Sequence, residues 1–370
     1  MKLRTKKVLG AFAVVLAVAV VALLTVTAYD SPCPTVTTTS DAPATMQAVR
    51  THCYGSTDVI TLEAVTRPTP TDDELLVRVH AAGVNPLDWH YMTGTPYIMR
   101  LSSGIGRPDS PLVGVDFSGT VEAVGPGVQR FAPGDRVFGG RSGAYAEYLV
   151  IRESRNVVHL PDNVDFVEAA ALPISGITAL QAVRDAGQVK PGQRILINGA
   201  SGGVGTFAVQ IAKAHGAHVT GVSSGRNVEL VLSLGADHVI DYTQQDFTRG
   251  SERYDVIIDN VGNHSLRAFR RALEPDGILV LVTGPKRNRW LGPISRVVWA
   301  KLTQPFVSQT QQMLLAELRP DDLTLLAEMM EAGTLRSVID QRFALDDAPA
   351  AIAYLEQGRT RGKNIIVVVP

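Results

Sequence analysis

A glycine-rich turn is the feature of this 370-residue sequence with the clearest chemistry. The apolar run Arg194–Ile197 leads into the turn Asn198–Gly205, and a helix is predicted over Thr206–His215. Glycines let a backbone approach a pyrophosphate closely, and the positive end of the following helix stabilises the phosphate charge. Because the next apolar run, His218–Val222, follows about 20 residues later, the spacing predicts a dinucleotide site.

The residues after the second apolar run indicate which dinucleotide binds. NAD sites usually place an acidic side chain there to hold the ribose hydroxyls, but this run ends in Ser223, Ser224 and Arg226, and the first acidic residue is Glu229. Hydroxyl groups and a guanidinium suit the 2′-phosphate of NADP(H). We therefore expect NADP(H) in preference to NAD(H). The alternative is that Arg226 is a solvated loop charge.

Two patterns of elements surround the turn. From Met46 to about Val158, short β-rich runs are separated by Gly and Pro turns, which is typical of a compact β-rich unit. From about Asp165, helices alternate with short apolar strands, which predicts a parallel, doubly wound sheet. A helix over Asp321–Ala332 and a strand over Asn364–Val369 end the chain. The predicted fold class is therefore α/β.

Composition excludes several classes of protein. The 35 basic and 36 acidic residues give a net charge of -1, whereas a dedicated nucleic-acid binder usually carries a basic excess. No nucleic-acid partner is therefore expected. The two cysteines, Cys33 and Cys53, are too few for a disulfide scaffold or a four-cysteine zinc site. A free Cys33 thiol and a Cys33–Cys53 disulfide are both left open.

The N-terminal segment, residues 1–29, is predicted to enter a membrane. Its 21 residues from Val8 to Ala28 carry no charge, about the length that spans a bilayer as a helix. A permanent anchor is favoured over a signal peptide cleaved near Ala28 and over a buried core helix. Preceding basic residues place the body outside the cytoplasm, where NADPH is scarce, so the side of the membrane stays open. The Pro-, Thr- and Ser-rich residues 30–45 predict an extended linker.

A series of motifs resembles the medium-chain dehydrogenase/reductase superfamily, most of all its zinc-free quinone oxidoreductase-like branch. The motifs are Ala82–Asp88, Gly114–Gly119, Gly134–Val137, Gly143–Tyr148, Ala170–Pro173, Gly176–Ala179, the glycine-rich turn and Leu234–Asp237. The resemblance covers residues 46–370. It implies a GroES-like catalytic domain in two parts, residues 46–168 and 306–370, around a Rossmann domain at residues 169–305.

Zinc-dependent members of this superfamily hold a catalytic zinc with two cysteines and a histidine. By motif position these ligands fall on Asn85, Val115 and Ala171, so no zinc is expected. The resemblance places Asn85 and His90 beside the nicotinamide as catalytic residues. His90 would donate a hydrogen bond or a proton; a packed loop histidine is the alternative. Asp88 is expected to cap the local helix turn.

The resemblance also implies a set of cofactor-binding residues. They come from the glycine-rich turn, from the ends of predicted strands, and from a return of the catalytic domain near the C-terminus. They are Thr178, Ser201, Gly202, Gly203, Val204, Ser223, Ser224, Arg226, Tyr242, Asn260, Gly262, Thr283, Gly284, Lys363 and Asn364.

A basic segment with two of the three tryptophans follows the fifth strand of the predicted Rossmann sheet. Within residues 286–306, apolar side chains at 290, 294, 297 and 298 follow helical spacing. The favoured interpretation is a helix that packs on its own domain or on a dimer mate. The alternative is a surface that lies on a lipid interface and admits a lipophilic substrate.

Together these features predict an NADPH-dependent, zinc-independent oxidoreductase that reduces quinones or α,β-unsaturated carbonyls by hydride transfer. Such π-systems accept hydride without a metal if the site orients both reactants and stabilises the developing negative charge. The expected partner is a small hydrophobic carbonyl or quinone substrate, and the resemblance allows a homodimer. The alternatives are an alcohol or carbonyl dehydrogenase and a non-catalytic, membrane-bound NADPH-binding adaptor.

Overall fold

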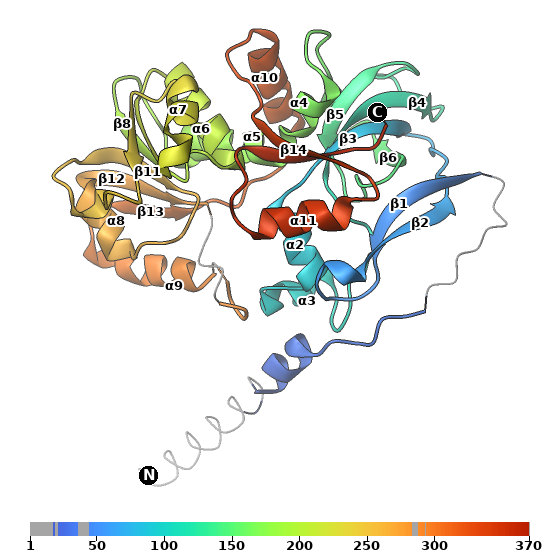
Figure 1. The fold of residues 1–370 in the computed structure, drawn as a ribbon, viewed down its shortest axis with the longest axis horizontal. Helices are drawn as coiled ribbons and strands as arrows, with labels where there is room; N and C mark the ends of the chain where they lie inside the picture. Colours follow the sequence, from blue (N-terminus) through green and yellow to red (C-terminus); the bar gives the residue numbers. More distant parts are fainter. Residues whose placement is uncertain (1–17, 19–20, 36–43, 283–287, 293, 370) are drawn as a thin grey trace, which may run out of the picture.

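Two large sheets lie side by side and organise the molecule (Figure 1). The structure is a computed structural model, and it describes residues 18, 21–35, 44–282, 288–292 and 294–369. One sheet belongs to a β-rich unit and the other to a parallel α/β unit, as the sequence predicts.

The first sheet has seven strands and is built from both halves of the chain. Its order is β14-β15-β3-β4-β5-β7, with β6 paired to β3. Leu75, Val77 and Val79 face its core while Arg78 is exposed, the alternation of a half-buried strand. The strands are β3 (Glu74–Gly83), β4 (Asp116–Val124), β5 (Arg136–Gly140), β6 (Tyr148–Arg152), β7 (Val157–His159), β14 (Ile339–Ala344) and β15 (Lys363–Val367), and a separate pair is β1 (Thr45–Thr51) and β2 (Ile60–Thr66).

The second sheet is entirely parallel and has the order β10-β9-β8-β11-β12-β13. In chain order this is 3-2-1-4-5-6, the doubly wound arrangement whose ligand crevice lies where the order reverses, between β8 and β11. The strands are β8 (Arg194–Asn198), β9 (His218–Ser223), β10 (His238–Asp241), β11 (Tyr254–Asp259), β12 (Leu273–Leu281) and β13 (Thr310–Met313).

Helices cover both faces of the parallel sheet (Figure 1). Ile195 and Ile197 of β8 pack with Phe207 of α6 in one core, whereas Leu196 packs with Phe269 of α8 in another. Burial on both faces explains the continuous apolar runs of these strands. From residue 44 onward, the α-helices of the described residues are α2 (Pro86–Thr93), α3 (Arg100–Ser103), α4 (Phe166–Ala170), α5 (Pro173–Gln181), α6 (Gly203–Ala214), α7 (Val228–Ser233), α8 (Leu266–Ala272), α9 (Ile294–Thr303), α10 (Pro320–Glu331) and α11 (Ala348–Glu356).

Strand β13 belongs to the Rossmann-type sheet, although the predicted domain boundary at residues 305/306 assigns it to the catalytic domain. The sequence places residues 306–370 in the catalytic domain, but β13 pairs with β12 and extends the parallel sheet. Its sequence, Thr-Gln-Gln-Met, has no apolar run, because an edge strand is covered less than a central one. The pairing therefore depends on tertiary contacts that periodicity does not reveal.

A disulfide joins the segment that precedes β1 to the body. Cys33 and Cys53 are bonded, with their Cα atoms 5.2 Å apart, which decides between the two alternatives for these residues. Residues 21–28 are helical. Most of the predicted anchor, residues 1–17 and 19–20, lies outside the described residues. Within the described part of the chain, no helix is both long and apolar enough to span a membrane.

Candidate active site

The glycine-rich turn connects β8 to α6 at the crevice between β8 and β11. Gly199 has a φ of 82°, a conformation that favours glycine. A Cβ on Gly205 would lie 2.1 Å from the Gly199 carbonyl oxygen, so the turn closes only without a side chain there. A Cβ on Gly202 would meet nothing nearer than 3.6 Å. Gly203 and Val204 then begin α6, so open backbone at a helix N-terminus fits a pyrophosphate.

An asparagine joins this turn to the end of β9. The side-chain amide of Asn227 donates to Ser201 Oγ at 3.0 Å and to Ser224 Oγ at 3.3 Å. Its Oδ1 atom is buried and has no hydrogen-bond partner among the described residues. No motif marks Asn227, so sequence reasoning misses it. The contact holds two expected cofactor-binding serines at fixed positions.

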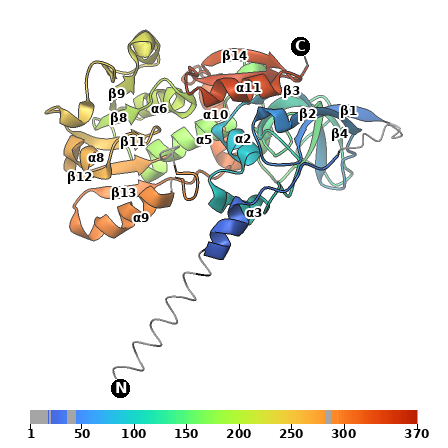
Figure 2. The same cartoon turned by 60° about the horizontal axis from the view of Figure 1, so that its bottom comes forward.

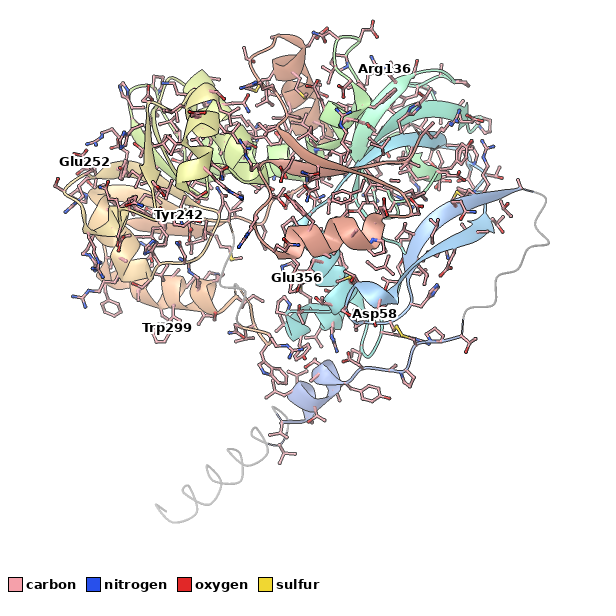
Figure 3. The ribbon with its side chains drawn as sticks, in the orientation of Figure 1. Asp58, Arg136, Tyr242, Glu252, Trp299 and Glu356 are labelled. Carbon is pink, nitrogen blue, oxygen red and sulfur yellow. A yellow bond between two sulfur atoms is a disulfide. The ribbon has the colours of Figure 1, made fainter. Side chains whose placement is uncertain are left out.

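The remaining expected residues of β9 and β10 border the same end of the sheet. Arg226 is exposed, and its Nη2 donates to the Arg359 carbonyl oxygen at 2.8 Å, so it reaches the loop before β15. Ser223 is buried, and its hydroxyl donates to the Ser224 carbonyl oxygen at 3.2 Å. Tyr242, labelled in Figure 3, is 59% exposed. The guanidinium and both serines therefore lie along one rim of the crevice.

The end of β11 closes the other side of the crevice. Asn260 follows this strand, and both polar atoms of its side-chain amide are buried without a partner among the described residues. A buried amide with unmet hydrogen bonds fits a polar ligand. By contrast, the N–H of Gly262 and the amide of Asn198 both bind Asp259 Oδ1, at 3.0 and 2.8 Å. The backbone of Gly262 therefore takes part in the conformation of this loop. Asn260, by contrast, has a side-chain amide available to hydrogen-bond a ligand.

Lys363 connects the glycine-rich turn to the catalytic domain. The preceding N–H, of Gly362, donates to the Ser201 carbonyl oxygen at 2.9 Å. The Lys363 side chain then passes Gly203, since a Cβ on that glycine would lie 3.2 Å from Lys363 Cδ. Its Nζ donates to Asn85 Oδ1 at 2.5 Å. One lysine side chain therefore spans the distance from the turn to Asn85.

Asn85 belongs to a buried polar cluster, here called the Asn85 cluster, which consists of Asn85, Asp88, Asp116, Tyr145 and Lys363. The Asn85 amide donates to Asp116 Oδ2 at 3.0 Å and to a backbone carbonyl at 3.3 Å. Asp88 Oδ2 accepts the Asn85 backbone N–H and the Tyr145 hydroxyl, both at 2.7 Å. The expected capping role of Asp88 is thus confirmed. Both amide protons of Asn85 are therefore engaged within the cluster, and its contact with the nicotinamide stays a prediction.

Burial controls protonation in the Asn85 cluster. It raises the pKa of Asp88 to about 7, and it raises the pKa of Asp116 and of Tyr145 above their usual ranges. It also lowers the pKa of Lys363, whose Nζ lies 3.5 Å from Asp116 Oδ2. The attraction of this pair opposes both shifts. Asp88 is therefore expected to change its protonation state near neutral pH.

Other expected site residues form hydrogen bonds with residues close to them in the sequence. His90 Nδ1 shares a hydrogen bond with the backbone carbonyl of Thr95, just after α2. The Thr178 hydroxyl donates to a carbonyl one turn earlier in α5, at 2.6 Å. Asn364 is buried and donates to a threonine hydroxyl at 3.2 Å. Their cofactor or substrate contacts stay predictions, and two further expected residues lie outside the described part, namely Thr283 and Gly284.

The three positions that would hold catalytic zinc do not suit the metal. The amide of Asn85 is used inside its cluster. Val115 and Ala171 have alkyl side chains without a donor atom. Within the described residues, no group of three or more His, Cys, Asp or Glu side chains is placed to hold a metal ion. The residues present at these positions therefore do not fit a catalytic zinc.

Comparison with known proteins decides the family. Residues 71–162 match the family model for an alcohol dehydrogenase GroES-like domain, and residues 234–366 match the model for a zinc-binding dehydrogenase. The mitochondrial NAD(P)H oxidoreductase RTN4IP1 of Mus musculus is 32% identical, over 90% of this chain and 92% of the relative. The chain belongs to the medium-chain dehydrogenase/reductase superfamily. It is an NAD(P)H-dependent oxidoreductase, as the resemblance implies.

Further similarities point to the quinone oxidoreductase-like members of this superfamily. The quinone oxidoreductase of Pseudomonas aeruginosa is 33% identical, over 85% of this chain and 97% of the relative. The 2-methylene-furan-3-one reductase of Solanum lycopersicum is 33% identical, over 90% of this chain and 82% of the relative. The crystal structure of Escherichia coli quinone oxidoreductase complexed with NADPH has a TM-score of 0.74 and 26% identity, over 87% of this chain and all 100% of that one.

Proposed function

We propose that this superfamily member uses NADPH to reduce quinones or α,β-unsaturated carbonyls by hydride transfer, without zinc. The observation that carries the proposal is the Asn85 cluster. It places a hydrogen-bonded asparagine where zinc-dependent members place a ligand, and Lys363 joins it directly to the glycine-rich turn. The relatives that act as a quinone oxidoreductase and as a 2-methylene-furan-3-one reductase support this substrate class.

The crevice offers residues for each part of NADPH. The open backbone at Gly202 and the N-terminus of α6 suit the pyrophosphate. Ser224 and the exposed Arg226 suit the 2′-phosphate, and the buried, unpaired amide of Asn260 suits a polar group near the nicotinamide. The solved neighbour that is complexed with NADPH supports the choice of dinucleotide. When bound, the dinucleotide supplies the hydride.

The protein's own groups orient the acceptor and deliver a proton. An acceptor that takes up hydride gains negative charge, which must be stabilised and then protonated. Asn85 is the N-cap residue of α2, and its bonds to Lys363 and Asp116 fix the start of that helix beside the glycine-rich turn. His90 lies one turn further along α2. Because the Nδ1–H of His90 donates to the Thr95 carbonyl oxygen, we assign the proton for the acceptor oxygen to Nε2 of the His90 imidazolium. We assign Asn85 and Lys363 the positioning of α2.

A panel of quinones, enones and alcohols tests the proposal. NADPH oxidation is expected with quinones or enones, unchanged by a metal chelator, and no NADP⁺ reduction is expected with alcohols. The variant His90→Ala should lower kcat by about 100-fold while leaving the Kd for NADPH unchanged. Its neighbour Tyr91 is 43% exposed, so Tyr91→Phe is a matched control that should keep the wild-type kcat.

Each alternative function has its own outcome in the same experiment. Chelator-sensitive oxidation of alcohols would contradict the proposal in favour of an alcohol dehydrogenase. Tight NADPH binding without turnover of any acceptor would contradict it in favour of a non-catalytic adaptor. Equal activity of the wild type and His90→Ala would leave the enzyme a reductase but remove His90 from its mechanism.

A further inference from the structure

Helix α9 turns its apolar side away from the protein. Of its two basic residues, Lys301 is exposed, whereas Arg296 points inward and pairs with the buried Asp259 at 2.8 Å, with only 11% of its side chain exposed. Val298, Trp299 and Leu302 point outward and are 49%, 64% and 59% exposed. Trp299, labelled in Figure 3, lies on the lower surface of the molecule. A surface helix of a soluble protein usually does the opposite and buries its apolar stripe.

The chain just before α9 is bonded to the region around α3. The N–H groups of Tyr97 and Ile98 donate to the carbonyl oxygens of Arg289 and Trp290, at 2.8 and 3.1 Å. The rings of Tyr97 and Trp290 also meet edge to face, with centroids 5.0 Å apart. The loop that leads into α9 is therefore attached to the segment just before α3, a helix in which Leu101 is 53% exposed.

A buried arginine fastens the N-terminal helical segment to this same region. Arg100, at the start of α3, is only 2% exposed. Its guanidinium donates to the carbonyl oxygens of Thr27 and Tyr29, at 3.0 and 3.1 Å, and pairs with Asp30 at 2.8 Å. Burying a guanidinium is costly unless its hydrogen bonds are met, so these contacts hold residues 27–30 firmly on the body.

The uncharged run Val8–Ala28 therefore ends on the body and not on a free linker. Residues 21–28 are helical and leave the molecule beside α3, on the side that carries α9 (Figure 1, Figure 2). Val21 and Val26 on this segment are 61% and 47% exposed. The Cys33–Cys53 disulfide adds a second attachment a few residues later. The point where this segment leaves the body and the loop that leads into α9 are thus both attached to the region around α3.

We propose that these parts form one surface that rests on a lipid bilayer. We name it the docking face, and it consists of residues 21–26, Tyr29, Leu101, Ile105, Trp290, Leu291, Ile294, Val298, Trp299, Leu302 and Phe306. The bilayer is the occupant that explains an uncharged run of 21 residues and an exposed apolar helix on the same side. Tryptophans mixed with the exposed basic residues Arg289 and Lys301 suit the interface of an anionic membrane. The proposal does not depend on the proposed reaction.

Tryptophan quenching in vesicles tests the docking face. The full-length protein is reconstituted into phosphatidylcholine and phosphatidylglycerol vesicles whose acyl chains carry bromine, which quenches nearby indoles. The three tryptophans are Trp89, Trp290 and Trp299. The double variant Trp290→Phe with Trp299→Phe should lose most of the quenching. Trp89→Phe is the matched control and should retain it, because Trp89 packs against the catalytic core. Both replacements on the docking face keep an aromatic ring, and Trp299 is exposed, so folding is preserved.

Two results would overturn the proposal. One is vesicle-bound protein whose fluorescence is not quenched, which would mean that the body stands away from the bilayer. The other is equal quenching of the Trp89→Phe variant and the Trp290→Phe, Trp299→Phe double variant, together with a dimer in detergent that Trp299→Glu dissociates. This result would mean that the apolar side of α9 binds a second copy of the chain.

Discussion

The carboxyl group of Asp88 couples its protonation to the stability of the fold. It is buried, and its pKa is raised from 3.8 to about 7, mainly by desolvation. Between these values the folded protein binds more protons than the unfolded chain, so its stability falls as the pH rises through this window. We expect Asp88→Asn to flatten this fall, with a gain at pH 8 relative to pH 5 of about 2–4 kcal/mol.

Urea unfolding at several pH values measures this effect. The asparagine lacks a titrating group, so any constant cost of its extra N–H group shifts the whole curve without changing its slope. The exposed Asp346 offers the control, and Asp346→Asn should follow the wild-type slope. If Asp88→Asn has the same slope as the wild type, burial does not hold a proton on this carboxyl.

Arg226 is expected to set the preference for NADPH. Its guanidinium is exposed beside two serines at the end of β9 and is held by a single backbone carbonyl. Arg226→Ala should weaken NADPH binding by about 10-fold and barely change NADH binding, because the 2′-phosphate is what distinguishes the two. Calorimetric titration with both dinucleotides measures the difference. The control is Arg249→Ala, since that side chain is 82% exposed, and an equal loss for both dinucleotides would contradict the role of Arg226.

At the scale of elements, alanine substitutions at two glycines of the glycine-rich turn are expected to have different effects. One should weaken cofactor binding, and the other should lower the stability of the fold. A Cβ at Gly202 would make only an ordinary contact, 3.6 Å from the Gly199 carbonyl oxygen, whereas a Cβ at Gly205 would lie 2.1 Å from that oxygen. Gly202→Ala should therefore fold with a stability within about 1 kcal/mol of the wild type but bind NADPH at least about 10-fold more weakly. Gly205→Ala should lose several kcal/mol of stability, because the turn and α6 must separate. Thermal unfolding and NADPH titration distinguish the two.

The opposite pattern would show that the turn does not hold the cofactor. If Gly202→Ala bound NADPH normally, the pyrophosphate would not approach this backbone. If Gly205→Ala kept its full stability, the turn would have room for a Cβ at that position, and the short distance to the Gly199 carbonyl oxygen would not require a glycine there.

At the scale of the whole molecule, the Cys33–Cys53 disulfide ties the N-terminal segment to the catalytic domain. The two cysteines are 20 residues apart in sequence, and closing a loop of that size stabilises a protein by about 3 kcal/mol in the chain-entropy model. Cys33 is exposed, so Cys33→Ala leaves no cavity. It should lower the free energy of unfolding by about 2–4 kcal/mol.

Reductant provides the control for the disulfide. It should destabilise the wild type and leave Cys33→Ala unchanged. Mass spectrometry of unreduced peptides should recover the linked pair from protein isolated without reductant. Such bonds persist in oxidising compartments, and the pairing agrees with one of the two predicted orientations, in which the basic N-terminal flank leaves the body outside the cytoplasm. Recovery of free thiols only would contradict the pairing.

Sequence reasoning succeeded where the signal is local. The glycine-rich turn, the helix after it and the apolar strands of the parallel sheet are marked by neighbouring residues, and all are found within a few positions of the expected bounds. It missed β13, whose polar residues form a strand only because β12 offers an edge. It also missed Asn227 and Tyr145 as parts of the site, because their partners lie in other elements. A carboxylate such as Asp116 inside an apolar strand is a signal that points to such a cluster.

The sequence by itself determined the family, the presence of a dinucleotide turn and the absence of zinc ligands at three positions, because each depends on residue types in a fixed order. The tertiary structure alone decided that Asn85 is locked by Lys363 from the other end of the chain. It also decided that α9 faces outward with its apolar side. Helical periodicity shows that a helix has two sides, but only packing against the rest of the protein determines which side is covered.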